Sequence, residues 1–301
     1  MVRPLDDIRE EIDHCSKIYP GFSEIGESLG SIFDAANEFM TEADAEKPMG
    51  IPVSQEEADK RFRRGESLCL RPEVDRDLFC KAASIACDGI VAMYPDVPDL
   101  DEAVRQFRRE FVDEAFTDCR ESFDFADEVV TDLLTLSPGN KALGRDLSTF
   151  IVASTLSFLY RRRLGDSHEL NTGLWGEGNC PVCGQKSHLG LLRDDDGARL
   201  LACWLCSTRW VYPRLQCPFC ESAEHEELGY FIVESMDICR LHFCRKCNRY
   251  LKVFDLRQYQ RDDLDPAIHH LATLSYDLAA AREGFVSGSE MQWIDKEQLQ
   301  D

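Results

Sequence analysis

Positive charge is scarce in this sequence. Its 301 residues contain 34 Lys and Arg against 56 Asp and Glu, which gives a formal net charge of −22. Because neutralisation of phosphates by Lys and Arg carries most of the non-specific affinity for nucleic acid, this balance argues against a nucleic-acid-binding protein. The hydrophobic content of 44% is too high for a disordered chain, and the length is typical of two domains.

Long apolar runs are also missing. None approaches the roughly 18–20 residues that a membrane span needs, and the best candidate, 150–160, contains Ser and Thr and is followed by arginines. We interpret it as a buried helix. The opening residues, MVRPLDDIREEID, contain no apolar segment of an export signal, so we expect a cytoplasmic protein.

The front of the chain is predicted to be helical. Apolar residues recur at helical spacing, and the acidic start of one segment suits a helix N-terminus. The main helices are expected at 74–94, 99–116 and 141–164, with shorter ones near 5–18, 28–42 and 54–64. The expected buried stripes are Leu78, Ala82, Ile85 and Gly89 in the first main helix, and Val104, Phe107, Phe111 and Ala115 in the second.

No recognisable chemistry lies in this helical part. We expect its cysteines to be core thiols, because free cysteine is among the most buried residue types. They are Cys15, Cys69, Cys80, Cys87 and Cys119. The run Arg161–Arg163 either grips an anion or, as we prefer, forms a solvated helix end. The acidic surface either docks a basic partner or simply keeps the protein soluble.

Nine of the fourteen cysteines lie in 180–247, and eight of them form four C-x-x-C pairs. In a reducing compartment such clusters indicate metal or redox chemistry rather than disulfides. Two pairs together offer the four thiolates of a tetrahedral site for zinc or iron. The pairs are Cys180 and Cys183, Cys203 and Cys206, Cys217 and Cys220, and Cys244 and Cys247.

The segments between the pairs favour one grouping of the four. Each reads as strand, polar turn, strand, and Asp196-Gly197 is a good hairpin turn. A hairpin brings its two ends together, so we expect the first pair to join the second and the third to join the fourth. The crossed grouping stays open. Each unit then has the layout of a zinc ribbon or a rubredoxin-like module, whose small core makes metal important for folding.

Other candidate ligands in this region are not needed for a complete set of eight. Cys239 alternates with Leu241 and Phe243, so we interpret it as a packed strand residue. The histidines His188, His225 and His242 are expected to be structural.

At these motifs the sequence resembles the FdhE family of formate dehydrogenase accessory proteins. The resemblance rests on the motifs CPVCG (180–184), GARLLACWLCSTRW (197–210), RLQCPFCE (214–221) and CRKCNRYLKV (244–253). The tail DPAIHHLATLSYDLAAAREGF (265–285) is similar to the closing helix of the family, whereas the last sixteen residues are not similar to its usual end.

The resemblance implies an α+β protein: an N-terminal all-helical domain, then two small rubredoxin-like or zinc-ribbon modules, then a C-terminal helix. The expected boundaries are 1–173, 174–214, 215–260 and 261–301. The resemblance also implies two metal ions, iron or zinc, held by the eight cysteines. The implied role is that of a non-catalytic chaperone that binds the molybdenum- or tungsten-containing catalytic subunit of formate dehydrogenase in the cytoplasm.

Two other functions remain as alternatives. The first is a rubredoxin-like iron protein for electron transfer or redox sensing. Rubredoxin turns usually place Gly after the second cysteine, and only Gly184 fits, whereas Ser207, Glu221 and Asn248 do not. The second is a nucleic-acid-binding zinc ribbon. It is disfavoured because residues 174–260 contain eleven basic and eleven acidic side chains.

Overall fold

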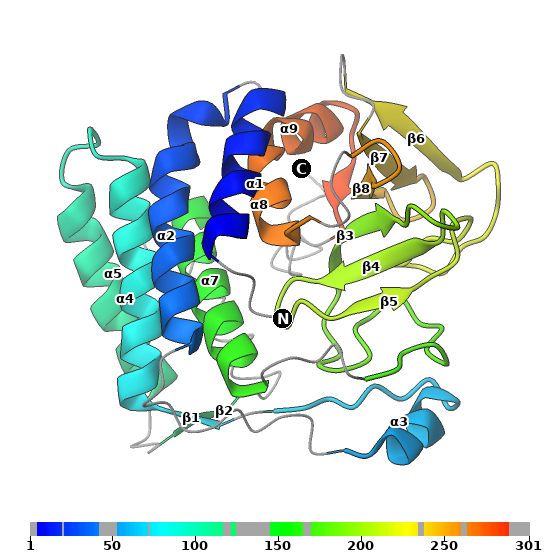
Figure 1. Cartoon of the computed structure of the whole chain (residues 1–301), viewed down its shortest axis with the longest axis horizontal. Coiled ribbons are helices and arrows are strands. Elements are labelled where there is room, and N and C mark those ends of the chain that lie inside the picture. Colours follow the sequence, from blue (N-terminus) through cyan, green and yellow to red (C-terminus); the bar gives the residue numbers. More distant parts are fainter. Residues whose placement is uncertain are drawn as a thin grey trace, which may run out of the picture. The chain divides into compact units, whose positions relative to one another are not determined.

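Two compact units make up the chain in the computed structural model (Figure 1). The structure describes residues 5–19, 21–41, 53–71, 73–116, 122–124, 145–164, 170–233, 238–259 and 264–288. The first unit comprises Met1–Pro52 and Arg71–Asp166, and the second comprises Val53–Leu70 and Ser167–Asp301. The expected helical domain therefore differs in one respect, because residues 53–70 pack with the cysteine-rich part rather than with the helices.

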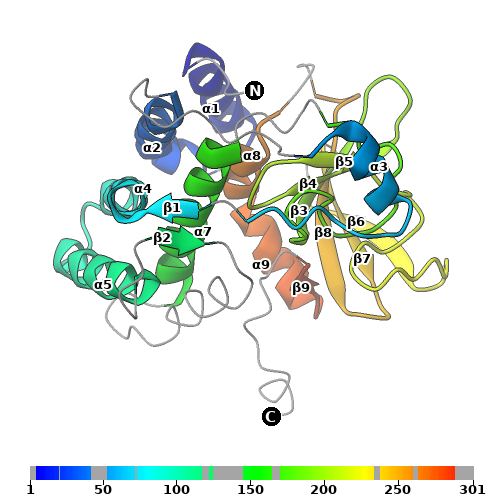
Figure 2. The same ribbon diagram turned by 90° about the horizontal axis from the view of Figure 1, so that it is seen from below.

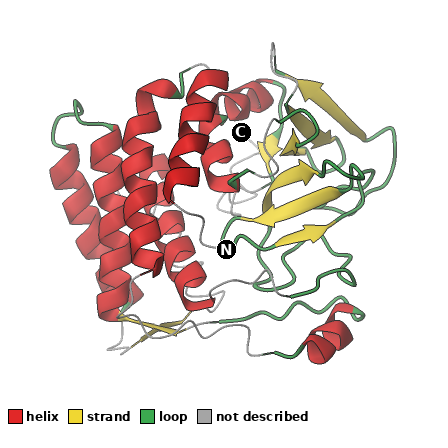
Figure 3. Ribbon diagram, in the orientation of Figure 1, coloured by secondary structure: helices red, strands yellow, loops and turns green. Residues whose placement is uncertain are grey.

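The first unit is mainly helical (Figure 3). Its helices are α1 (Leu5–Ile18), α2 (Ser23–Thr41), α4 (Arg76–Met93), α5 (Leu100–Ala115) and α7 (Arg145–Leu164). The short strands β1 (Glu73–Asp75) and β2 (Ser122–Asp124) pair antiparallel. Helix α4 packs against α2, α5 and α7, so it lies at the centre of this unit. The helices expected at 74–94, 99–116 and 141–164 correspond to α4, α5 and α7.

Aromatic packing between α4 and α5 builds the core of the helical unit. Phe79 contacts Phe111 and Phe116, with ring centroids 5.2 Å and 5.4 Å apart. The stripe predicted for α5 is confirmed, since all four of its residues are buried. The stripe predicted for α4 is confirmed at Ala82 and Gly89, which are buried, but not at Leu78 and Ile85, which are half-buried. The buried residues are Phe79, Ala82, Ala83, Ala86, Cys87, Gly89 and Ile90.

A seven-stranded sheet forms the centre of the second unit (Figure 2). Its strands are β3 (Ser187–Leu192), β4 (Arg199–Cys203), β5 (Arg209–Val211), β6 (Leu228–Ile232), β7 (Cys239–Cys244), β8 (Arg249–Asp255) and β9 (Val286–Ser287). The order is β5-β4-β3-β8-β7-β6, and β9 adds to β8. Both hairpins predicted from the sequence are present, as β3–β4 and β6–β7, each paired antiparallel.

The two hairpins belong to one sheet because β8 pairs parallel with β3. The register runs from Leu189 opposite Lys252 to Leu192 opposite Asp255. Leu191, Val253 and Phe254 are buried, with exposed fractions of 0–1%, so this pairing forms part of a continuous core. Strand β8 was not predicted from the sequence, and the expectation of two separate small modules gives way to two hairpins in one sheet.

The closing segment consists of two short helices rather than one. Helix α8 (Pro266–Ala272) ends at Thr273, where α9 (Leu274–Arg282) begins. Lys252 on β8 explains how they attach to the sheet. Its Nζ donates to the carbonyl oxygens of His270 and Thr273, at 3.1 Å and 3.2 Å, and lies 2.9 Å from Oδ2 of Asp277. The ammonium group thereby caps the end of α8 and pairs with an acid on α9.

Residues 53–70 form a strap along the cysteine-rich unit. Helix α3 (Gln55–Phe62) begins at Ser54, whose side chain accepts from the backbone N–H of Glu57. After this helix the backbone N–H groups of Leu68 and Leu70 donate to the carbonyl oxygens of Pro181 and Val182, at 2.7 Å and 3.0 Å. The strap therefore binds the backbone of the first C-x-x-C turn.

Two single-residue predictions are wrong, those for Cys69 and Arg162. Cys15 and Cys87 are buried as predicted and Cys80 is half-buried, but Cys69 is exposed, so its assignment to the core is wrong. Cys119 lies outside the described residues. Arg162 is buried, with its guanidinium 4.4 Å from the ring centroid of Phe39, so it is not part of a solvated helix end. No helix in the described ranges is long and apolar enough to cross a membrane.

Candidate metal centres

The four C-x-x-C segments fold as the same kind of tight turn. In the first three, the N–H of the residue after the second cysteine donates to the carbonyl of the first cysteine. The donors are Gly184, Ser207 and Glu221, with distances of 3.0, 3.1 and 2.9 Å. Backbone N–H groups also point at sulfur, since those of Val182 and Phe219 lie 3.4 Å from Sγ of Cys180 and Cys217. Such turns present both thiols of a pair to one point.

The turns bring the eight cysteines into two clusters, with sequential rather than crossed grouping. Within each cluster all four Sγ atoms lie within 4.8 Å of one another. We refer to them as the first cluster and the second cluster. The first contains Cys180, Cys183, Cys203 and Cys206, and the second contains Cys217, Cys220, Cys244 and Cys247.

The spacing of the sulfurs fits a tetrahedral metal ion. A tetrahedron with metal–sulfur bonds of about 2.3 Å has sulfur–sulfur edges of about 3.8 Å. In the first cluster three of these edges measure 3.4 Å for Cys180–Cys206, 3.4 Å for Cys183–Cys203 and 3.6 Å for Cys183–Cys206. In the second they are 3.7 Å for Cys217–Cys247 and for Cys220–Cys244. Four sulfur donors at these distances suit zinc or iron.

Burial makes the thiolate form of the first cluster's cysteines unfavourable unless a cation neutralises their charge. All four of its cysteines are buried. Burial, followed by hydrogen bonds from neighbouring thiols, raises the pKa of Cys183 well above its ordinary value, and burial likewise raises the pKa of Cys203. A bound cation would reverse this effect by stabilising the thiolates. The hydroxyl of Thr208, 3.1 Å from Sγ of Cys206, is placed to donate to one of them.

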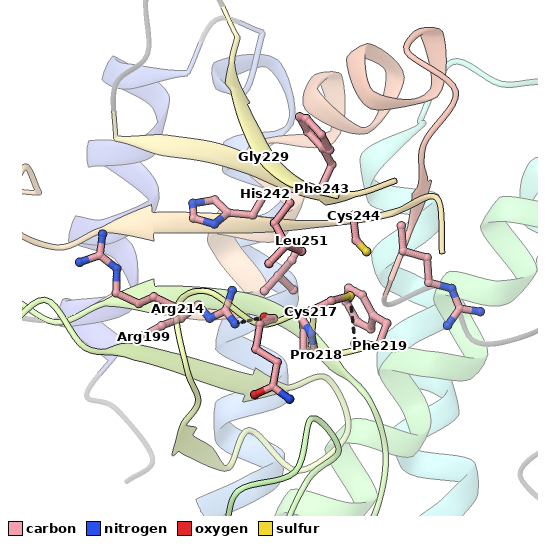
Figure 4. A pocket seen from close by; sticks show the side chains of 13 residues that line it. Arg199, Arg214, Cys217, Pro218, Phe219, Gly229, His242, Phe243, Cys244 and Leu251 are labelled. Carbon is pink, nitrogen blue, oxygen red and sulfur yellow. Dashed lines mark hydrogen bonds between the residues drawn. The ribbon is translucent and has the colours of Figure 1, made fainter. Parts of the chain in front are cut away.

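The second cluster is less enclosed, because Cys220 and Cys247 are only half-buried. The pKa of Cys217 is lowered to about 5, and the hydrogen bond with Cys247 is the main cause. A small cavity lies against this cluster, lined by Cys217, Cys244 and Phe219 on one side and by arginines on the other (Figure 4).

The residue after the second cysteine is left-handed in all four turns. Gly184 has φ of 81°, and Ser207, Glu221 and Asn248 have φ of 59°, 59° and 54°. The sequence argument that missing glycines disfavour a rubredoxin-like turn is therefore weakened, because the three other residues adopt the same backbone. They do so at a cost of roughly 1–2 kcal/mol each in conformational energy, which is least for Asn.

A close backbone contact joins the first and third turns. A Cβ placed on Gly178 would lie 1.9 Å from the carbonyl oxygen of Pro218, so only glycine fits there. Since Gly178 precedes Cys180 and Pro218 follows Cys217, this contact connects the two clusters through the backbone. The sequence motif GNCPVCG contains this glycine, but its packing partner could not be inferred from local sequence.

The other candidates considered as ligands lie outside both clusters. Cys239, at the start of β7, is fully buried, and burial raises its pKa to about 12, in agreement with a packed strand residue. Nδ1 of His188 lies 3.1 Å from the carbonyl oxygen of Ala202. His242 stacks on Tyr230 with ring centroids 5.8 Å apart, and His225 is exposed. None of the three histidines joins a metal-ligand group within the described residues.

Comparison with known proteins finds relatives for the part of the chain that contains this site. Residues 179–214, which include the whole first cluster, match the family model described as the FdhE central domain. The resemblance to the FdhE family is confirmed. A "Protein FdhE homolog" from Aquifex aeolicus is 35% identical over 144 residues, which are 46% of this chain and 49% of that relative. Another FdhE homolog, from Pseudomonas aeruginosa, is 33% identical over 119 residues, covering 36% and 37%.

The sequence matches to these FdhE homologs span about half of their length or less. The fold likeness is more extensive. The crystal structure of the FdhE protein from Pseudomonas aeruginosa superimposes with a TM-score of 0.61 and covers 95% of this chain and 93% of that one. At 21% identity this match establishes a shared fold of helices and sheet.

Proposed function

We propose that this chain is a cytoplasmic accessory factor needed for the assembly of active formate dehydrogenase. The observation that carries the proposal is the pair of four-cysteine clusters in one sheet of an FdhE-like fold. Four thiolates complete the coordination of a tetrahedral ion, so neither centre offers a vacant position for a substrate. The chain therefore acts by binding the catalytic subunit rather than by turnover.

The eight cysteines are proposed to hold two ions, iron or zinc, one in each cluster. The replacement Cys203→Ser tests this assignment because it removes one ligand of the first cluster alone. Protein purified without oxygen should carry about two ions per chain, and the variant about one, with the second cluster still filled. A Cys239→Ser variant serves as the control and should keep both ions. Loss of both ions from the Cys203 variant would contradict independent centres.

A surface beside the last turn is a candidate contact for the catalytic subunit. Arg245 and Lys246 are exposed there, and Arg245 lies over the ring of Phe243, 5.0 Å from its centroid. The adjacent groove contains three aromatic rings, of which Phe243 and Phe285 stack with centroids 4.7 Å apart. Apolar surface next to positive charge suits a polypeptide partner with acidic residues at the edge of an apolar segment.

The functional test uses a deletion strain that contains no second copy. Deletion should abolish formate dehydrogenase activity while the catalytic subunit is still synthesised, and the wild-type chain should restore activity and co-purify with that subunit. Lys246→Glu should weaken co-purification without changing metal content. Lys60→Glu, in the exposed part of α3, is the matched control. Normal activity in the deletion strain would refute the proposal.

Electron transfer or redox sensing by iron is the second candidate function. It is favoured by the left-handed residue in all four turns and by the half-buried second cluster, which leaves a path for electrons near the surface. A visible spectrum and metal analysis of anaerobically purified protein separate the two candidates. Bound zinc would exclude the redox function, whereas iron that cycles reversibly between oxidation states would support it.

A further inference from the structure

Strand β6 forms an open edge of the sheet in the second unit. It stands last in the order β5-β4-β3-β8-β7-β6, and among the described strands it pairs only with β7 (Figure 1). Natural sheets usually protect such an edge with Lys, Pro, a bulge or a very short strand. The sequence of β6, LGYFI, contains no charged residue and no Pro, and its register with β7 has no bulge. The opposite edge strand, β5, is only three residues long.

The register with β7 shows which backbone groups of β6 are open. Hydrogen-bonded pairs alternate with non-hydrogen-bonded pairs along antiparallel strands. The N–H of Arg245 donates to the carbonyl oxygen of Glu227 at 2.8 Å, so the next residues of β6 that bond to β7 are Gly229 and Phe231. The N–H and C=O groups that point away from β7 belong to the remaining residues, Leu228, Tyr230 and Ile232. These groups have the spacing needed to pair with a further strand.

Apolar side chains lie on both faces of this edge. On one face Tyr230 and Ile232 are 55% and 43% exposed. On the other face Phe231 lines the aromatic groove, and its ring centroid lies 5.9 Å from that of Phe243 and 6.3 Å from that of Phe285. The volume of the groove is about 600 Å³, so the side chains of an added strand have room on this face.

Two arginines of β7 and of the turn after it place positive charge on both faces. Arg240 lies over Tyr230, 5.3 Å from its ring centroid, and Arg245 lies over Phe243 beside the groove. Glu283 also lines the groove. Neither arginine forms a salt bridge with any residue that the structure describes, so a carboxylate of a partner can pair with each.

We propose that β6 binds an extended segment of the formate dehydrogenase catalytic subunit by strand addition. Its apolar side chains enter the groove, and its carboxylates face Arg240. The occupant is an extended chain because the open groups of β6 are backbone donors and acceptors spaced as in a sheet. This inference rests on the proposed function, and it extends the contact proposed at Arg245 and Lys246 to the neighbouring strand.

A second copy of this chain fits the edge less well. Pairing of two copies would bring together two chains that each have a net charge of −22. Strand β6 also contains no carboxylate to meet Arg240 of the other copy. A partner segment that has both apolar and acidic residues satisfies both faces of the edge.

The test variant is Ile232→Pro. Proline removes an N–H that points away from β7, so the change breaks no hydrogen bond inside the sheet. The metal-loaded full-length chain is titrated with the purified catalytic subunit. The variant should bind about tenfold more weakly, because one backbone hydrogen bond is lost and the proline ring obstructs the added strand.

Amide hydrogen exchange of the wild-type complex, resolved by residue, provides a second measurement. Exchange should slow on binding at the open amides of Leu228, Tyr230 and Ile232. It should change less at Gly229 and Phe231, whose N–H groups already bond to β7. Binding of the subunit by side chains alone would not produce this alternation.

Val211→Pro is the matched control. Val211 lies on the other edge strand, β5, and is also 43% exposed. The N–H of Tyr212 donates to the carbonyl oxygen of Arg199 at 2.9 Å, so the N–H of Val211 likewise points away from its neighbour, β4. This variant should bind the catalytic subunit like the wild type.

The outcomes separate this inference from the proposed function. Absence of binding by the wild type would overturn the proposed function and this inference with it. Binding by the wild type that Ile232→Pro does not weaken relative to Val211→Pro would overturn strand addition alone, as would unchanged exchange at Tyr230. A dimeric chain that Ile232→Pro converts to monomers would assign the edge to a second copy and would also overturn the inference.

Discussion

Single residues decide how closely the turns of the two clusters approach each other. The clearest case is Gly178, which lies against the carbonyl group of Pro218 on the third turn. A side chain there would meet backbone rather than a flexible group, so the two turns would have to separate. The left-handed residues after the second cysteines are a further constraint, because they set the direction in which each chain leaves its turn.

We expect Gly178→Ala to lower the free energy of unfolding of the sheet unit by about 1–3 kcal/mol, the usual cost of overpacking. The measurement is chemical denaturation of the metal-loaded protein. Gly176→Ala is the control, because a Cβ at Gly176 meets nothing within 4 Å. Equal stability of the two variants would show that the contact between the first and third turns is not tight.

At the scale of elements, Lys252 is the link between strand β8 and the closing helices. Its side chain is fully buried and its ammonium group reaches Asp277 of α9. The hydroxyl of Tyr250, on the same strand, donates to the other carboxylate oxygen of Asp277 at 2.5 Å. Tyr250 and Lys252, two residues apart in the motif CRKCNRYLKV, are thus explained by the attachment of α8 and α9 rather than by metal binding.

Lys252→Met should destabilise the sheet unit by about 3 kcal/mol, because it leaves a partly buried carboxylate and two carbonyl oxygens without their donor. Hydrogen exchange should increase in residues 264–288 before it increases in the β3–β4 hairpin. Lys246→Met, at an exposed position, is the control. Unchanged exchange in the closing helices would contradict the proposed link.

At the scale of the whole molecule, the two units differ in what stabilises them. The helical unit has an aromatic core that includes Phe79 and Phe111, and it contains none of the eight clustered cysteines. The sheet unit depends on turns whose ligand thiols come together only when it is folded. Metal loss should therefore affect the two units unequally.

Chelation is expected to unfold the sheet unit while the helical unit stays largely helical. Far-ultraviolet circular dichroism should retain most of its helical signal. Near-ultraviolet signals from Trp204 and Trp210, which lie in the sheet unit, should be lost. Readdition of metal is the control for reversibility. An intact sheet after complete metal removal would show that its apolar core, including Leu191 and Phe254, is sufficient for folding.

Local sequence predicted those features that depend on residues close together in the chain. Helices α4, α5 and α7 were recognisable because apolar residues recur at the helical period along each of them. The grouping of the eight thiols was predictable because Asp196-Gly197 closes a hairpin that brings Cys183 and Cys203 together. In α4 the prediction found Ala82 and Gly89 but missed Ala83 and Ala86, since small residues on both sides of the stripe mark the buried face poorly.

Only the tertiary structure decided the features that join distant segments. The parallel pairing of β3 with β8 and the binding of Leu68 and Leu70 to the first turn leave no periodic signal in either partner. The hairpin pattern between the cysteine pairs was enough to favour the grouping of thiols that the structure has, because a hairpin is a local structure. Packing between the hairpins determined what surrounds them, because it depends on contacts that the folded chain alone creates.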